Sequence, residues 1–429
     1  MQRCSLSLPL PGLVLFAALS SCGGSGDTSS NAPVAEGEVG GSITFLNNGP
    51  LAYDPATVIN MDRFDAAHPE VSVSRVEDNA VLARLSTLVA GGGEAFDVAE
   101  PAAMNIPQFI DIGMLLPLDD LFPPEEMARY PKGTLDAVTG RDGRIYGKPH
   151  YVLPQVLLYN KKLLAEAGFD RPPSTWEEIG SYGKALTHPE KDQWGYAFGL
   201  APNRDTYHIF ASYLYQAGAT LFHADYSAAF NNDKGREALH FMVDLLNDHK
   251  IAPPGITTYD GDAVQDLFIR GSAAMVQNWG YTIDRALNRE ESVLKDDLGV
   301  APLPVGPSGE LSGYLVMFPL VATASTNNPA TAKAFIEFMT DAESQQRMLI
   351  DEPGNAVVPP DIFALPEVRE TVPFASELGM MIEASRAEYH PQSGQVVTIL
   401  VEEVHAAMAM TKSVDQALVD AEARVTQLM

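Results

Sequence analysis

Apolar residues between positions 42 and 99 recur with two spacings that alternate along the chain. Strand-like spacing covers 42–46, 71–76 and 96–99, whereas 54–67 and 80–90 carry the spacing of helices. This order predicts a βαβαβ unit, which is built on parallel strands. We therefore expect an α/β fold with a mostly parallel sheet.

Signals for helix starts lie further along the chain. Ser174 and Glu177 have the spacing of a capping box, in which the Ser174 hydroxyl accepts a hydrogen bond from the backbone N–H of Glu177. Asn328 followed by Pro329 is a second start signal. Apolar residues recur at helical intervals across 233–249, and the carboxyl-terminal third is predicted to be mainly helical.

The amino terminus has the composition of an export signal. Arg3 is followed by an apolar run at 13–19, which is too short to span a membrane. The run ends in Leu-Ser-Ser-Cys22, which resembles the lipobox of bacterial lipoproteins, where the cysteine is diacylated and becomes the first residue. We expect residues 1–21 to be a signal peptide and 22–40 to be a flexible tether. An ordinary signal peptide cleaved nearby is the alternative.

Cysteine content and charge exclude several classes of protein. Of the two cysteines, Cys4 would leave with the signal and Cys22 would carry lipid, so no thiol remains for a disulfide or a zinc site.

A chain of 429 residues that is 46% hydrophobic can build two lobes. The formal net charge of −28 would repel nucleic-acid phosphates, so we expect no nucleic-acid partner.

The sequence lacks short motifs of catalysis. It contains no His-Glu-x-x-His, no Gly-x-Ser-x-Gly and no phosphate loop, because Gly147-Lys148 is followed by Pro149. No two histidines are four residues apart, so a helical metal site is unsupported. We predict neither an enzyme nor a cofactor nor a metal. A glycoside hydrolase with paired carboxylates is the enzymatic alternative.

Longer motifs carry a resemblance to a family. Residues 147–149, 158–169 and 172–178 give a strand ending in Tyr-Asn-Lys, a helix closed by Ala-Gly, and a Pro-Pro-x-Thr-Trp-x-Glu helix start. Residues 268–281 add a helix, a glycine and a strand that leads to a tryptophan loop. On these motifs the chain resembles the bacterial extracellular solute-binding proteins, which include the maltose-binding protein and related sugar receptors.

The resemblance extends from about residue 42 to the end of the chain. It implies a two-lobed fold like that of type II periplasmic binding proteins, with a hinge and an inter-lobe ligand cleft. By analogy, lobe 1 would comprise 41–148 plus 300–350, and lobe 2 would comprise 149–299 plus 351–429.

The resemblance also implies a function and its partners. The chain would be the solute-binding component of an ABC importer, a monomer that binds a carbohydrate and docks on permease subunits. The lipid at Cys22 would hold it on the periplasmic or cell-surface face of a membrane. A sensory lipoprotein of the same fold, which presents its ligand to another receptor, is the alternative.

Candidate ligand contacts follow from the chemistry of sugars, which need flat apolar faces for the ring and polar groups for the hydroxyls. Trp279 stands at the tryptophan-loop position of the family and is expected to stack on the ligand. Asp205 and Tyr207 stand where relatives carry an acidic residue and an aromatic residue that face the cleft. A core tryptophan and surface turn residues are the alternatives.

Further candidates lie where predicted strands end, because such ends open toward a cleft. Asn48 and Glu100 follow the first and third strands, and His150 and Tyr151 follow the first crossing between lobes. Tyr314 opens the returning strand, and Gln155 in the crossing strand is a weaker candidate. For Asn48 and Glu100, plain solvation of a loop is the alternative.

Two departures concern the identity of the ligand. Gly49-Pro50-Leu51 lacks the charged residues of maltose-type relatives, and Pro101 stands where those relatives can carry an aromatic residue. The departures put a maltose-like ligand in question and leave a polyol, sugar acid, amine or metal chelate open.

Overall fold

The computed structural model describes residues 37–48, 55–78, 80–89, 91, 96–351 and 359–429. The predicted signal peptide, the lipidation site Cys22 and most of the tether lie outside the described residues. The departure at 49–51 lies outside them as well.

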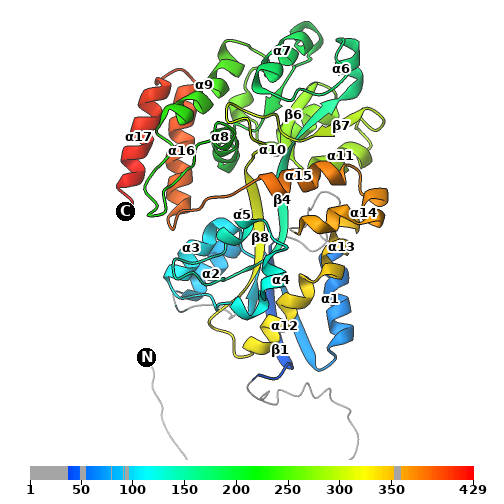
Figure 1. Ribbon diagram of the computed structural model, residues 1–429, viewed down its shortest axis with the longest axis vertical. Coiled ribbons are helices and arrows are strands. Elements are labelled where there is room, and N and C mark those ends of the chain that lie inside the picture. The colour runs from blue at the N-terminus through cyan, green and yellow to red at the C-terminus, as the bar shows by residue number, and fades with distance from the viewer. Residues whose placement is uncertain (1–36, 49–54, 79, 90, 92–95, 352–358) are drawn as a thin grey trace, which may run out of the picture.

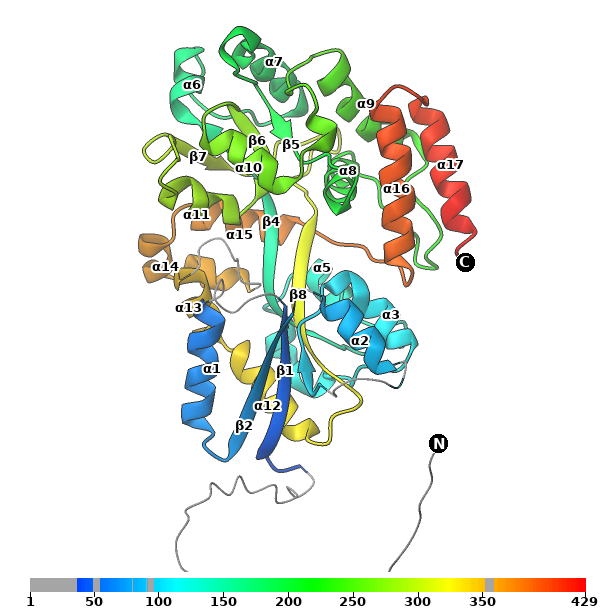
Figure 2. The same ribbon diagram turned by 180° about the vertical axis from the view of Figure 1, so that it is seen from behind.

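Two lobes lie one above the other, and long strands run between them (Figure 1, Figure 2). The lower lobe holds β1 (Gly41–Asn48), β2 (Val71–Asp78), β3 (Val98–Ala99), α1 (Pro55–Ala67), α2 (Val81–Val89), α3 (Ile106–Asp111), α4 (Pro124–Met127), α5 (Lys132–Asp136), α12 (Pro329–Met339) and α13 (Ala342–Asp351). The upper lobe holds β5 (Ala197–Phe198), β6 (Met275–Trp279), β7 (Leu298–Ala301), α6 (Lys161–Glu166), α7 (Trp176–Leu186), α8 (Arg204–Gln216), α9 (Asp233–Asn247), α10 (Gly261–Ile269), α11 (Tyr281–Asn288), α16 (Ser393–Met408) and α17 (Val414–Thr426). Between the lobes, α14 (Pro366–Thr371) packs on α13, and α15 (Ala375–Ala384) packs on β4 (Lys148–Asn160).

The predicted βαβαβ unit is confirmed in the lower lobe. β1 pairs in parallel with β2 and with β3, and α1 and α2 make the two crossovers. Phe45 on β1 lies against Phe335 of α12, with ring centroids 5.3 Å apart, and Phe64 of α1 meets the same ring edge-on at 5.0 Å. Aromatic contacts of this kind hold the helices to the sheet.

Two strands connect the lobes. The first half of β4 pairs with β8 (Leu315–Ala322), from Lys148 opposite Leu320 to Pro154 opposite Leu315. The second half of β4 pairs with β6 and β7 in the upper lobe. One sheet of order β2-β1-β3-β8-β4-β6-β5 therefore runs through both lobes.

The expectation of a mostly parallel sheet is wrong beyond the first unit. β3–β8, β4–β8, β4–β6 and β4–β7 are antiparallel pairs, and β5–β6 is a parallel pair in the upper lobe. The reason is that β4 leaves the lower lobe and β8 returns to it, so the two strands run in opposite directions.

The predicted helix starts are present, and one capping detail is shifted by a residue. The N-cap of α7 is Thr175 rather than Ser174, and its hydroxyl accepts from Glu178 N at 3.3 Å. The Glu178 carboxylate reaches back to Ser174 N at 2.7 Å, so the reciprocal pair is made by Glu178 instead of Glu177. α9 and α12 begin where the sequence predicts, at Asp233 and Pro329, and α12 to α17 make the last third mainly helical.

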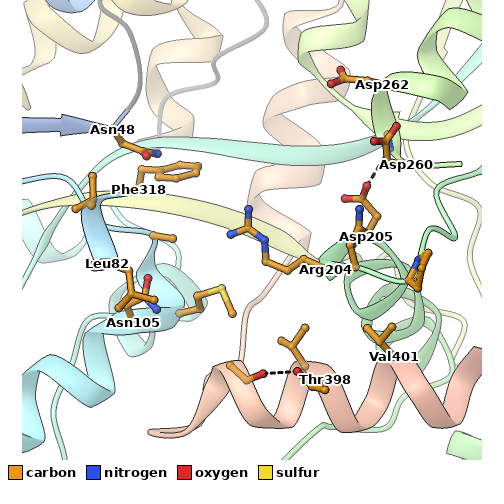
Figure 3. A pocket seen from close by; sticks show the side chains of 18 of the residues that line it. Asn48, Leu82, Asn105, Arg204, Asp205, Asp260, Asp262, Phe318, Thr398 and Val401 are labelled. Atoms are coloured by element: carbon orange, nitrogen blue, oxygen red, sulfur yellow. Dashed lines mark hydrogen bonds between the residues drawn. The ribbon is translucent and has the colours of Figure 1, made fainter. Parts of the chain in front are cut away.

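One helix is buried along its length and positions the site. Every residue of α8 from Thr206 to Gln216 is buried, because α9 and α16 pack against it. Its amino-terminal turn alone faces open space, at the level where the lobes meet (Figure 3).

Across the described stretches of the chain, none of the helices combines the length and apolar character needed to cross a membrane. The residues at which each lobe begins and ends stay a prediction.

Candidate ligand-binding site

An open cleft of about 1160 Å³ lies between the lobes (Figure 3). Its lower wall comes from the end of β1, from α2 and from the start of α3. Its upper wall comes from the amino-terminal ends of α8 and α10 and from one face of α16. The lining residues are Asn48, Val81, Leu82, Ala102, Met104, Asn105, Gln108, Pro202, Asn203, Arg204, Asp205, Asp260, Gly261, Asp262, Tyr281, Phe318, Gly394, Val397, Thr398, Val401, Glu402 and His405.

A smaller inner pocket of about 210 Å³ opens from this cleft. The rest of its lining is mainly apolar and aromatic, and the residues that it shares with the cleft are Ala102, Met104, Arg204, Asp205, Tyr281 and Phe318. The residues that line only the inner pocket are Ala103, Leu153, His208, Trp279, Tyr314, Val316, Met317 and Tyr389. The site therefore combines an aromatic end with a long polar cleft.

Asp205 lies where two helix starts meet. Asn203 caps α8 by accepting from Asp205 N at 2.8 Å, and Asp260 caps α10 by accepting from Ala263 N at 2.9 Å. The Asp205 carboxylate accepts from Gly261 N at 2.9 Å and so links the two helices. Burial raises the pKa of Asp205 above its usual value, more than the Gly261 hydrogen bond lowers it.

Three of the aromatic rings that line the inner pocket pack against one another. The His208 ring stacks on Tyr314 at 4.8 Å and meets Trp279 edge-on at 5.4 Å. Burial, helped by the charge of Arg204, lowers the pKa of His208 to about 3, so its imidazole is neutral at physiological pH. Within the described part of the chain, the buried His208 Nδ1 has no hydrogen-bond partner. Trp279, at the end of β6, is 7% exposed and lines this pocket.

Tyr207 does not line the cavity. Its side chain is 3% exposed, its ring packs edge-on against Tyr314 at 5.8 Å, and its hydroxyl donates to the Glu388 carbonyl at 3.5 Å. Tyr207 lines neither the cleft nor the inner pocket, whereas the next residue, His208, lines the pocket. Adjacent helical side chains point about 100° apart, which explains the difference.

The candidates at the strand ends form two layers. Asn48 lines the cleft, and its backbone N–H donates to Glu100 Oε2 at 3.4 Å. Glu100 and His150 are fully buried beneath it, with His150 Nδ1 2.5 Å from Glu100 Oε1. Tyr151 stacks on the cleft residue Phe318 at 4.7 Å. The structure thus brings Asn48 to the cleft and places Glu100, His150 and Tyr151 behind its wall.

The remaining candidates lie close to the inner pocket. Tyr314 lines it, and Asp205 lines both the pocket and the cleft. Gln155 accepts from Gln277 Nε2 at 2.9 Å and borders a very small cavity together with Asp205 and Trp279. Asp205, Trp279 and Tyr314 are therefore brought together in the inner pocket, and Asn48 lines the outer cleft from the lower lobe.

The sequence profile of the bacterial extracellular solute-binding proteins matches residues 51–346 of the chain. The chain belongs to this family. It resembles the maltose-bound protein MalE3 of T. maritima with a TM-score of 0.76 and 25% identity, over 90% of this chain and all of that one. The predictions of the family and of the two-lobed fold are confirmed.

Two relatives extend the comparison. A Deinococcus radiodurans protein named a "probable ABC transporter-binding protein" is 26% identical over 55% of this chain and 56% of its own length. A Sinorhizobium fredii protein named a "probable amino-acid ABC transporter periplasmic-binding protein" is 25% identical over 91% of this chain and 90% of its own length. The first of these matches spans little more than half of the relative.

Several lining residues of this solute-binding protein had not been predicted. Arg204 and His208 lie within one helical turn of Asp205, and Tyr281 lies two residues after Trp279, so helical and loop spacing could have indicated all three. Tyr389 and the α16 residues come from a segment far away in sequence, and no local signal marks them. Their place in the site depends on how the chain returns between the lobes.

The described part of the protein offers no group of three or more His, Cys, Asp or Glu side chains that could hold a metal ion.

Proposed function

We propose that this protein is the extracytoplasmic solute-binding component of an ABC importer and that its ligand is a carbohydrate. The observation that carries the proposal is the aromatic inner pocket that opens into a polar cleft between two lobes. Trp279 and Phe318 supply aromatic rings, and Asp205 and Asn48 supply groups for hydroxyls. Such a site buries the apolar face of a sugar ring while its hydroxyls form hydrogen bonds.

The neighbours suggest two classes of ligand. One solved neighbour is bound to maltose, and one relative carries the name of an amino-acid transporter protein. A cleft of about 1160 Å³ that is continuous with an aromatic pocket suits a solute larger than a single amino acid. We therefore place carbohydrates first and amino acids second.

We propose that a lipid on Cys22 holds the protein on the outer face of a membrane and that residues 22–40 act as its tether. The Leu-Ser-Ser-Cys22 motif supports this proposal. Two acyl chains are sufficient for stable anchoring. Labelling of cells with a palmitate analogue tests the proposal, because Cys22→Ser should abolish incorporation and release the protein.

The proposed partners are the permease subunits of the importer, which would bind a surface formed by both lobes when they close on the ligand. The proposed lobe boundaries are those implied by the resemblance, 41–148 plus 300–350 for lobe 1 and 149–299 plus 351–429 for lobe 2. We propose that the protein acts as a monomer without catalysis. Turnover of a glycoside by the purified protein would contradict the proposal that it has no catalytic activity.

A thermal-shift screen tests the class of ligand. The panel contains monosaccharides, oligosaccharides, polyols and amino acids, because a ligand that binds only the folded state raises the melting temperature. We expect the largest shift from a carbohydrate. Shifts from amino acids alone would contradict the carbohydrate proposal and leave the family assignment intact.

A further inference from the structure

The acidic groups of the cleft differ in what neutralises them. Asp262 lies 3.7 Å from Arg285, and Glu402 lies 2.6 Å from Arg424. Asp260 accepts a backbone N–H as the cap of α10. Asp205 likewise accepts only the backbone N–H of Gly261, and no lysine, arginine or histidine of the described residues forms an ion pair with it.

Asp205 is also the acidic group that reaches the inner pocket. Of the four carboxylates, it alone lines both the cleft and the pocket. Burial raises its pKa, which means that its negative charge is poorly solvated where it stands. A positive charge placed beside it would stabilise the ionised form.

Burial raises the pKa of Asp205 and the charge of Arg204 offsets part of that rise, but no cation of the described residues forms an ion pair with Asp205. Arg204 is the nearest cation in the chain, but its guanidinium extends away from Asp205, toward the side of Asn48 and Phe318, while Asp205 faces α10 (Figure 3). His208 is neutral because burial lowers its pKa to about 3. The buried His208 Nδ1 is without a hydrogen-bond partner in the described structure, which leaves a polar atom available in the pocket wall.

The rest of the pocket wall suits a cation as well. Trp279, Tyr281, Tyr314, Phe318 and Tyr389 surround the space next to Asp205. The face of an aromatic ring attracts an ammonium group, and the attraction grows when the ammonium is removed from water. A neutral hydroxyl in the same place would gain the hydrogen bond to Asp205 but little from the rings.

We propose that the inner pocket selects a carbohydrate that carries a protonated amine, with its ammonium beside Asp205 and its ring against Trp279. This inference rests on the proposed function and names the substrate class more closely. The outer cleft, which is more than five times larger, holds the remainder of an amino-sugar oligomer.

Titration calorimetry with matched pairs of sugars tests the proposal. The pairs are D-glucosamine with D-glucose and D-galactosamine with D-galactose, and the members of each pair differ only in an ammonium or a hydroxyl at one carbon. N-acetyl-D-glucosamine is added because it keeps the nitrogen and loses the charge. We expect at least one amine to bind at least tenfold more tightly than its neutral partner and than the N-acetylated sugar.

Two variants localise the effect. Asp205→Asn should reduce the preference for the amine to threefold or less. Asp266→Asn is the control. It removes the same charge from a carboxylate in α10 that forms an ion pair with Arg289 at 3.1 Å, and it should leave the preference for the amine unchanged. Melting temperatures of both variants show whether they fold, and the ligand pairs test the wild-type protein without any variant.

The outcomes separate this inference from the proposed function. Neutral sugars that bind as tightly as their amines would overturn the amine preference and leave the carbohydrate proposal standing. A preference that survives Asp205→Asn would overturn the role of Asp205. Glycine, lysine or choline binding more tightly than every sugar would overturn both proposals, and so would an absence of binding to the whole carbohydrate panel.

Discussion

The Nδ1 atom of His150 lies 2.5 Å from Oε1 of Glu100, and neither side chain is exposed to solvent. Glu100 follows β3, and His150 lies in β4 at the point where the register between β4 and β8 shifts. The second carboxylate oxygen of Glu100 accepts from Asn48 N at 3.4 Å, so the pair holds the backbone of a residue that lines the cleft.

The Glu100–His150 pair should be important for stability. Glu100→Ala would leave the imidazole buried without its partner, and we expect the free energy of unfolding to fall by about 3 kcal/mol. The measurement is urea denaturation at pH 7.5. A double-mutant cycle with His150→Ala gives the coupling between the two side chains, which should be large because they are in direct contact.

The lower lobe contains a matched control for this experiment. His68 and Glu70 form the same kind of pair, with Nδ1 and Oε1 3.1 Å apart, but their side chains are 30% and 50% exposed. Glu70→Ala should change stability little, because solvent screens an exposed pair. Equal losses from Glu70→Ala and Glu100→Ala would contradict the view that burial gives the Glu100 pair its importance.

Trp279 should be important for ligand binding rather than folding. Trp279→Ala removes the largest ring of the inner pocket, and we expect ligand affinity to fall at least tenfold, about 1.4 kcal/mol or more, while the protein stays folded. Trp194→Ala is the control, since Trp194 lines neither the cleft nor the inner pocket. Unchanged affinity in calorimetry after Trp279→Ala would remove this ring from the site.

His208 should make stability depend on pH. The unfolded chain takes up a proton on this imidazole near its ordinary value of 6.5, whereas the folded chain does so at about 3. Between these values the unfolded state binds more protons, so stability decreases as the pH falls and is complete only above about pH 6.5. From pH 7 to pH 5 the contribution of His208 is a loss of about 2 kcal/mol.

Urea denaturation at pH 7 and pH 5 checks this expectation. His208→Phe should make the difference in stability between the two pH values smaller by about 2 kcal/mol. His223→Phe is the control, because that side chain is exposed and its surroundings change little on unfolding. An identical pH dependence in His208→Phe and wild type would show that His208 is not buried in its neutral form.

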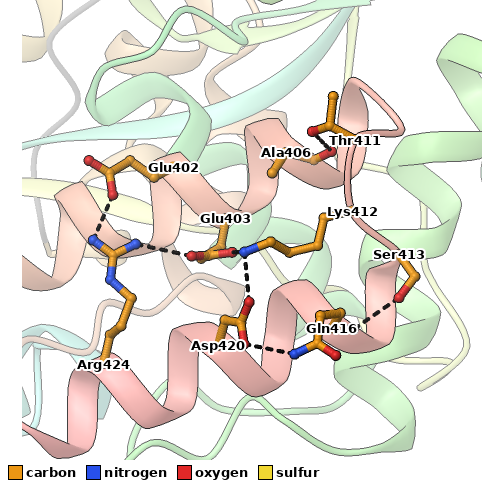
Figure 4. Close-up of polar contacts among 9 residues, drawn as sticks. All are labelled: Glu402, Glu403, Ala406, Thr411, Lys412, Ser413, Gln416, Asp420 and Arg424. Carbon is orange, nitrogen blue, oxygen red and sulfur yellow. Dashed lines mark hydrogen bonds and ion pairs between the residues drawn. The ribbon is translucent and has the colours of Figure 1, made fainter.

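A network of charged side chains joins α16 to α17 (Figure 4). Glu403, only 9% exposed, lies 2.5 Å from Lys412 Nζ and 3.0 Å from Arg424 Nη1, and Arg424 also holds the cleft residue Glu402 at 2.6 Å. Glu403→Gln should lower the free energy of unfolding by about 2 kcal/mol, because both cations lose a charged acceptor. Asp420→Asn, on the exposed side of Lys412, should cost less, and urea denaturation compares the two.

The parts of the fold that depend on neighbouring residues could be predicted from the sequence. β1, β2, α1 and α2 follow from the spacing of apolar residues, and α12 from Asn328 before Pro329. The antiparallel course of β4 and β8 could not be predicted in this way, because their partners lie more than 150 residues apart.

The candidate site also depends on packing that local sequence does not reveal, even for single residues. Asp205, Trp279 and Tyr314 are three of the predicted ligand contacts, and all three line the inner pocket. Tyr207 and His208 differ only in which face of α8 they occupy, and that face depends on how α8 packs against the rest of the upper lobe. Contact between the predicted site residues and a ligand stays a prediction until binding is measured.

The paired course of β4 and β8 restricts how the lobes can move. The strands are hydrogen-bonded to each other from Lys148–Leu320 to Pro154–Leu315, so they form a two-stranded ribbon. Such a ribbon bends easily perpendicular to its face, whereas its hydrogen bonds resist the sliding of one strand along the other. We expect the lobes to tilt about one axis and not to slide past each other. Leu153, Val316 and Phe318 of this ribbon also line the inner pocket, so that side of the pocket should keep its shape at every tilt. Discrimination among solutes would then begin on first contact, before the lobes have closed.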